Sequence, residues 1–300
     1  MIQISDLTPI FDTLPEADQN HAVETGAWTF TPIHHGKNRL FRGDSAHAEN
    51  PVALKIYADR RNAEREFAVL HALRDSGINL APEALALKDN AVIMTWIEGD
   101  SMQPPAPDDS ENWHRMMAAV GASGELHFVD YTAQVPMQGH AFQNPRDVLD
   151  AIEQLQTQIN AKDSAHERLA ELLERMREQV APDWIESPPI GLCRNRFDLH
   201  DLIWNGHHLL AVDWEHADWG DMAAEIGLWS SQPAFESIAA GHWVWFRWEF
   251  ARLTKDQNLI PRATTYARLA QVWWAARLTL DRADTALRDR YLARAEKIFR

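Results

Sequence analysis

Hydrophobic and polar residues alternate over much of the first hundred residues, a pattern that predicts β-strands. The segment 28–45 predicts a strand, a glycine-containing turn and a second strand. The segment 50–58 predicts an apolar strand interrupted by one charge, Lys55, and 83–99 predicts two strands around an Asp-Asn turn. Between them, 60–77 has apolar residues at helical spacing and stops at a glycine, which predicts one helix among the strands.

Beyond a proline-rich polar stretch, 101–112, which suits a connection between lobes, the apolar spacing becomes mostly helical. Helical patterns cover 112–129, 144–180, 221–231, 241–257 and 262–299. One hairpin interrupts them, because the strand-like runs 202–204 and 207–212 are joined by Asn205-Gly206, which predicts a type I′ turn.

Two lobes follow from this change of pattern. We expect a β-rich N-terminal lobe over 1–99 and a larger, mostly helical C-terminal lobe over 100–300. The predicted fold class is α+β.

Composition narrows the possible partners. Of the 300 residues, 45% are hydrophobic and 24% are charged, as in ordinary globular proteins, and the formal net charge is −15. A nucleic-acid-binding surface needs an excess of basic residues, so no nucleic-acid partner is expected. The sequence has no apolar run long enough to span a membrane, no signal-peptide pattern and a single cysteine, which together lead us to expect a cytoplasmic protein without a membrane partner.

Lys55 is the first candidate for chemistry, because it lies inside the apolar run Val-Ala-Leu-Lys-Ile-Tyr. Burial of an ammonium group costs free energy unless an anion meets it. A functional Lys55 would contact a phosphate and be held by a carboxylate of the next helix, for which Glu64 and Glu66 are both available. The commoner alternative is an edge-strand lysine that extends its charge into water.

The turn His-His-Gly-Lys-Asn contains Gly36 and Asn38 and could cover phosphates with its backbone N–H groups. One glycine is weak support for this, and an ordinary hairpin turn has the same composition. The histidine pairs 34–35 and 207–208 have neither a nearby cysteine nor the helical spacing of a zinc site, so we interpret them as surface histidines.

Two carboxylates flank the predicted hairpin. Asp201 directly precedes its first strand and Asp213 follows its second, so closure of the hairpin brings their backbones together. Mg²⁺ retains several waters and needs few protein oxygens, which suits such a pair when the metal arrives with a nucleotide. A single aspartate at a strand end commonly caps a turn, but the pair together with Lys55 favours a metal site.

In this order the features resemble the aminoglycoside phosphotransferase and choline kinase superfamily, and within it bacterial thiamine kinase-like proteins most closely. The resemblance spans most of the chain and implies a bilobal protein-kinase-like fold. The matching stretches are "PIHHGKNRLFRGD" for the nucleotide-covering loop, "ALKIY" for the lysine strand, "EREFAVLHAL" for the helix with its glutamate, "VIMTWIEGDSM" for the hinge, "GELHFV" for a helix end, and "LLAVDWEHADWGDMAAEIGLW" for the metal-aspartate stretch.

The resemblance implies ATP (or GTP) and Mg²⁺ as cofactors. Lys55 would bind the α- and β-phosphates, and Glu66 is the better match for the glutamate that orients it. The adenine would meet the backbone of Thr95, Trp96 and Ile97. Asp201 and Asp213 would hold the metal.

The family's catalytic loop reads His-Gly/Asn-Asp-x-His-x-x-Asn, and this chain departs from it. Aligned without gaps, Arg194 replaces the first histidine, Arg196 the catalytic aspartate, Asp198 the second histidine and Asp201 the metal-binding asparagine. This alignment is favoured because Asp201 immediately precedes a strand, as the family's asparagine does. A shifted alignment would match Asp198-Leu199-His200 to Asp-Leu-His, but it leaves no asparagine five residues on.

An arginine is permanently protonated, so Arg196 cannot act as a base, and Asp198 is the candidate replacement. We therefore expect an ATP-dependent phosphotransferase that acts on a small alcohol through an altered loop. That alcohol could be cationic and bind some of the thirteen tryptophans, although most of these should be core. The alternatives are a pseudokinase that binds nucleotide or a protein partner without transfer, and an enzyme in which Arg196 contacts a phosphate or acidic substrate.

Overall fold

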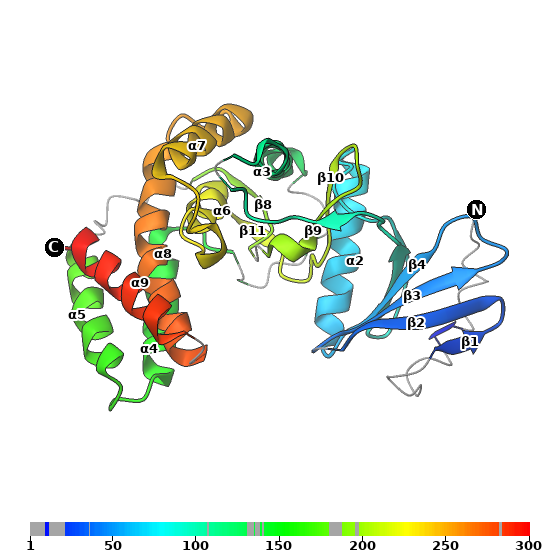
Figure 1. Ribbon diagram of the computed structural model, residues 1–300, viewed down its shortest axis with the longest axis horizontal. Helices are drawn as coiled ribbons and strands as arrows, with labels where there is room; N and C mark the ends of the chain where they lie inside the picture. Colours follow the sequence, from blue (N-terminus) through cyan, green and yellow to red (C-terminus); the bar gives the residue numbers. More distant parts are fainter. Residues whose placement is uncertain are drawn as a thin grey trace. The chain divides into compact units, whose positions relative to one another are not determined.

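The computed structural model describes residues 10–11, 22–35, 37–106, 108–130, 135, 139, 141–179, 188–195, 198–281 and 284–300 (Figure 1). The chain divides into two compact units. The first contains Met1–Met102, Val129–Gln138 and His200–Ala217, and the second contains Gln103–Phe128, Gly139–Leu199 and Asp218–Arg300. The hairpin region thus groups with the N-terminal strands, and the lobes 1–99 and 100–300 stay a prediction about domains.

The first unit is built on an antiparallel sheet with one helix beside it (Figure 1). In spatial order its strands are β1 (Val23–Thr25), β2 (Trp28–His35), β3 (Arg39–Ser45), β4 (Val52–Ile56), β6 (Ala91–Thr95) and β5 (Ala84–Lys88). Helix α2 (Arg60–Asp75) packs on β5 and β6. It begins where the side chain of Asp59 accepts a hydrogen bond from the Arg61 N–H, and it ends before Gly77, whose φ is 72°.

A smaller sheet in the first unit contains the predicted hairpin. Its strands, in spatial order, are β10 (Leu209–Ala211), β9 (Leu202–Trp204) and β7 (Asp100–Ser101). The expected two-residue type I′ turn is wrong, because Trp204 pairs with Leu209 and leaves a four-residue loop. Asn205 closes this loop by accepting hydrogen bonds from two backbone N–H groups, those of His207 and His208.

Gly99 enters this small sheet at a close approach. Its φ is 151°, and a Cβ there would lie 2.4 Å from the carbonyl oxygen of Trp204. Only glycine fits this contact.

The second unit is mostly helical and is centred on α8 (Leu259–Asp281) (Figure 1). Around it pack α4 (Pro145–Gln158), α5 (Ser164–Gln179), α6 (Met222–Trp229), α7 (Ala240–Thr254) and α9 (Thr285–Ile298), and α3 (Ser110–Glu125) packs on α7. Short 3₁₀ turns are η2 (Leu126–Phe128), η4 (Leu199–Asp201, which straddles the two units) and η5 (Pro233–Phe235). A two-stranded sheet pairs β8 (Ile190–Cys193) with β11 (Asp218–Asp221).

Two helical patterns in the sequence are each a pair of helices. The stretch 144–180 breaks after α4, where Asn160 accepts from the Lys162 N–H and Asp163 accepts from the Ala165 N–H to start α5. The stretch 262–299 breaks before α9, which Asp284 caps. Side-chain capping of this kind competes with the helical backbone, and apolar spacing does not reveal it.

The strand-rich first unit and the larger helical second unit confirm the predicted α+β class. Among the helices that the structure describes, none is long and apolar enough to cross a membrane.

Candidate active site

Lys55 is buried in an interior strand of the main sheet. The neighbours of β4 are β3 and β6, so the edge-strand alternative does not apply. Val52, Leu54 and Ile56 pack into the apolar core on one face, and the alternation of a strand directs Lys55 to the other. There its Nζ lies 2.7 Å from Oε2 of Glu66.

Helix α2 offers two glutamates, and only one of them reaches Lys55. Residues two apart on a helix point in nearly opposite directions. Glu66 is 1% exposed and also accepts a hydrogen bond from Tyr57 Oη at 2.5 Å. Glu64 instead forms an exposed ion pair with Arg60 at 2.7 Å. The position of Glu66 is the one that the resemblance favoured.

The ammonium of Lys55 also forms an ion pair with Asp213. Burial alone would lower the pKa of Lys55, but the charges of Glu66 and Asp213 outweigh burial and raise that pKa above its usual value. Lys55 is therefore a fixed positive charge at neutral pH. Burial, followed by the charge of Glu66, raises the pKa of Tyr57, so its phenol stays protonated and donates.

Asp213 follows β10 in a left-handed backbone conformation, with φ of 64°. Aspartate tolerates this conformation better than most residues do. The N–H of Val212 donates to the carbonyl oxygen of Asp201 at 2.9 Å, so the backbones beside the two aspartates lie next to each other, as hairpin closure predicts. The side chain of Asp213 is 21% exposed, which leaves part of the carboxylate open to a ligand.

Glu215 is a residue to which the sequence analysis gave no role. It is 3% exposed, and its Oε2 accepts hydrogen bonds from Asn38 Nδ2 at 2.8 Å and from Asn62 Nδ2 at 3.3 Å. Nε2 of His216 lies 3.4 Å from the other oxygen. The available signal was a second acid two residues after Asp213 in an otherwise apolar stretch.

Asn38 lies in the turn between β2 and β3, as predicted. Besides donating to Glu215, it accepts a hydrogen bond from the Ala58 N–H at 3.2 Å, which ties the turn to the chain after β4. Gly36, the other residue predicted to cover phosphates, lies outside the described residues.

The predicted hinge follows β6. The N–H of Thr95 donates to Glu83 at 2.9 Å, and the N–H of Trp96 donates to Pro51 at 3.2 Å. The guanidinium of Arg42 lies 5.3 Å from the ring centroid of Trp96. Ile97, the third predicted residue, is partly buried just beyond these contacts.

The model of the phosphotransferase enzyme family matches residues 29–271, which is most of the chain. The chain belongs to the phosphotransferase enzyme family.

Several solved structures have a similar fold. A choline/ethanolamine kinase family protein from Mesorhizobium loti is 18% identical, with TM-score 0.60 over 90% of this chain and 87% of that one. Choline kinase from Cryptosporidium parvum Iowa II is 15% identical, with TM-score 0.63 over 91% and 89%. The ADP-bound aminoglycoside phosphotransferase APH(2'')-Ib is 15% identical, with TM-score 0.64 over 96% of each chain. No curated protein matches the sequence significantly.

The start of the predicted catalytic loop lies in the second unit. Arg194 is 2% exposed, and Asn195, with φ of 62°, donates its N–H to Oε2 of Glu225 on α6 at 3.1 Å. Burial raises the pKa of Glu225, while the Asn195 N–H and the charge of Arg194 oppose that rise. Glu225, which the sequence analysis did not single out, thus anchors the loop by accepting a hydrogen bond from the backbone N–H of Asn195.

The remaining loop residues are divided between the two units. Asp198 is partly buried and belongs to the second unit, whereas Asp201 ends η4 in the first. Arg196 lies outside the described residues, so the choice between the two alignments stays a prediction.

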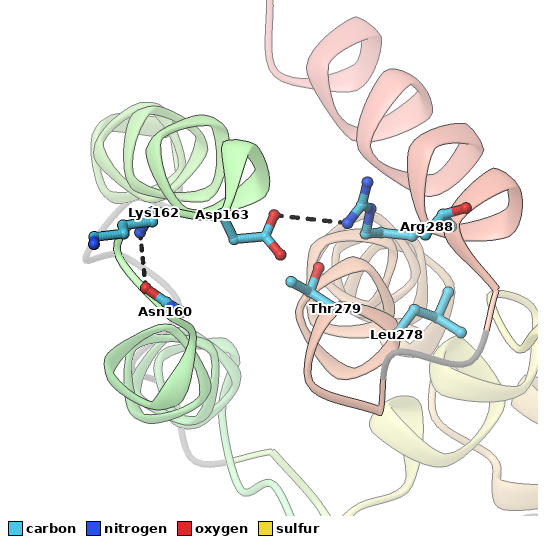
Figure 2. A pocket seen from close by; sticks show the side chains of 7 residues that line it. Asn160, Lys162, Asp163, Leu278, Thr279 and Arg288 are labelled. Carbon is cyan, nitrogen blue, oxygen red and sulfur yellow. Dashed lines mark hydrogen bonds and ion pairs between the residues drawn. The ribbon is translucent and has the colours of Figure 1, made fainter.

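A cavity of about 370 Å³ lies in the second unit, and none of the predicted site residues lines it (Figure 2). It lies between the turn that joins α4 to α5 and the facing ends of α8 and α9. Asn160, Lys162, Asp163, Leu278, Thr279, Thr285 and Arg288 line it.

Proposed function

We propose that this phosphotransferase transfers the γ-phosphoryl group of ATP to a hydroxyl group of a small molecule, with Mg²⁺. The observation that carries the proposal is the buried network of Lys55, Glu66 and Asp213. The two carboxylates hold the ammonium of Lys55 as a positive charge fixed in place, which is what a phosphate site requires. That one structure of similar fold contains ADP is further support.

Lys55 would bind the α- and β-phosphates, and Glu66 would orient it. Glu66 holds the ammonium at 2.7 Å, and Tyr57 fixes that carboxylate in turn. A charge positioned before the nucleotide arrives needs no reorganisation during the reaction.

Asp201 and Asp213 would hold the metal ion. Within the described part of the chain, no group of three or more His, Cys, Asp or Glu side chains is placed to hold a metal. Two aspartates that leave the remaining positions to phosphate oxygens and water match the coordination that Mg²⁺ prefers. When bound, Mg²⁺ neutralises charge on the transferred phosphoryl group.

The adenine would lie against the backbone of Thr95 to Ile97. The N–H groups of Thr95 and Trp96 already donate within the protein. We therefore expect a contact to an amide N–H of this segment to involve Ile97.

Asp198 is the candidate base for the acceptor hydroxyl. In the ungapped alignment Arg196 would take the position of the usual base, and an arginine cannot accept the proton of the hydroxyl. Phosphoryl transfer depends mainly on positioning and electrostatics, so loss of the usual base slows the reaction without preventing it. The acceptor is a small alcohol, which could be cationic, or an acidic molecule if Arg196 binds it.

A second candidate is a pseudokinase that binds nucleotide and recognises a protein partner. The burial of Arg194 beside Glu225, where the family has histidine, favours it. In that case nucleotide binding would set the conformation that the partner recognises, and no phosphoryl group would be transferred.

Thermal unfolding with and without ligand tests the proposal. ATP with Mg²⁺ at 100 times its Kd should stabilise the protein by about 2.7 kcal/mol, and chelation of the metal should reduce the effect. Transfer of labelled phosphate to a panel of small alcohols then separates enzyme from pseudokinase. The absence of any shift with ATP or ADP at millimolar Mg²⁺ would contradict both.

A further inference from the structure

One buried carboxylate joins three separate segments of the first unit. Glu215 follows β10, Asn38 lies in the turn between β2 and β3, and Asn62 lies in the first turn of α2. Both asparagines donate to the same oxygen, Oε2 of Glu215, at 2.8 and 3.3 Å. We call these three side chains the clasp.

We propose that the clasp positions the β2–β3 turn for nucleotide binding, with Glu215 as a positioning residue that acts through Asn38. This inference rests on the proposed function, because that turn is the segment expected to cover the phosphates. The clasp links the turn to Asp213, two residues before Glu215. It thereby couples the part of the site that would cover phosphates to the part that would hold metal.

The surroundings of Glu215 make these hydrogen bonds strong. The residue is 3% exposed, and a hydrogen bond to a buried carboxylate is stronger than one between neutral groups. If the buried carboxylate of Glu215 lost these donors, the free-energy cost of removing it from water would no longer be offset by hydrogen bonds. Asn38 is constrained from its other end as well, since its Oδ1 accepts from the Ala58 N–H.

Metal ligation is the competing role for Glu215. In this structure Oε2 accepts from two amide groups at once, which occupies both of its lone pairs, so coordination through that oxygen would require at least one of these bonds to break. The clasp and the metal-ligand role predict opposite results when donor and acceptor are exchanged.

The test compares the single variant Asn38→Asp with the double variant Asn38→Asp/Glu215→Gln. The single variant keeps the shape of the side chain at position 38 and its hydrogen bond from the Ala58 N–H, but it places a second carboxylate against that of Glu215. The double variant restores the hydrogen bond between positions 38 and 215 with donor and acceptor exchanged, and it keeps the net charge of the pair. Asn62 can rotate its side-chain amide so that its oxygen accepts a hydrogen bond from the new amide at position 215. Asn160→Asp is the matched control, because Asn160 also accepts a backbone N–H in a turn but lies in the second unit (Figure 2).

The first measurement needs no nucleotide. Trypsin cleavage after the exposed Lys37, identified by mass spectrometry, reports opening of the turn. We expect cleavage about tenfold faster in the single variant than in the double variant. Both carry the same residue after Lys37, so the difference reflects the clasp. The Asn160→Asp variant should be cleaved after Lys37 at the same rate as the parent protein.

The second measurement is the KM for ATP, or the Kd if no transfer occurs. The single variant should bind ATP about tenfold more weakly, and the double variant should recover most of that loss. Equal cleavage in both variants, or a double variant that binds no better than the single one, overturns the clasp. If the double variant binds metal-ATP worst of all, Glu215 is a ligand instead. Failure of the parent protein itself to bind ATP overturns the proposed function, and the cleavage comparison still decides whether the clasp exists.

Discussion

At the scale of single residues, Glu66 and Glu64 provide a matched pair on one helix. We expect Glu66→Gln to weaken ATP binding about tenfold, because a charged hydrogen-bond partner of Lys55 is lost. Glu64→Gln should leave ATP binding nearly unchanged, because exposed ion pairs such as Glu64–Arg60 contribute little. Titration of ATP by calorimetry measures both.

Circular dichroism must first show that both variants are folded, since Glu66 is buried. Equal ATP affinity in the two variants would mean that Glu66 does not orient a phosphate-binding lysine. The buried network would then be purely structural.

Arg196 and Asp198 decide between the two alignments of the catalytic loop. If Arg196 faces the acceptor hydroxyl, Arg196→Asp supplies a base and should raise phosphotransfer by about 10²–10⁴-fold. If Asp198 is already the base, Asp198→Ala should abolish transfer and Arg196→Asp should change little. Rates with labelled ATP measure both variants, and a chain with no activity before or after either change is a pseudokinase.

At the scale of elements, the contact between α6 and α8 depends on a glycine. A Cβ at Gly227 would lie 2.6 Å from Tyr266 Cβ and 2.7 Å from the carbonyl oxygen of Ala263, so the two helices would have to separate. We expect Gly227→Ala to lower the free energy of unfolding by about 1–3 kcal/mol, despite the better helix propensity of alanine.

Gly121 in α3 is the control, because nothing lies within 4 Å of the position its Cβ would take. There alanine should stabilise the protein by up to about 1 kcal/mol. Urea unfolding measures both variants. A stabilising effect of alanine at both sites would show that α6 and α8 are not packed as closely as described.

Periodicity also has a limit at this scale. It located β2 to β6 of the main sheet and α2, but not the short edge strand β1, because burial of one face imposes a period of 2 or 3.6 on a sequence only over a sufficient length. It did not find β8 and β11, which are four residues long and pair glycine with glycine at Gly191 and Gly220. Such short strands depend on their partner and leave no pattern of their own.

At the scale of the whole molecule, segments that are far apart in the sequence belong to the same compact unit. The first unit takes in 200–217, a hundred residues after its main sheet ends. Strand β7 pairs with β9, and the Ala211 N–H donates to Leu80. A change of pattern near residue 100 marks where helices begin, but it carries no information about a later hairpin that returns.

The sequence by itself determined the α+β class and the family resemblance. It also singled out Lys55, because a charge within an apolar run must meet a partner wherever the chain folds, and Asp213, because it follows the predicted hairpin. Only the tertiary structure decided which partner. It chose Glu66 over Glu64 by their angular positions on α2, and it placed Asp213 beside Lys55. It also brought Glu215 to Asn38, 177 residues away, a hydrogen bond that no local pattern encodes because it forms only when three distant segments are packed together.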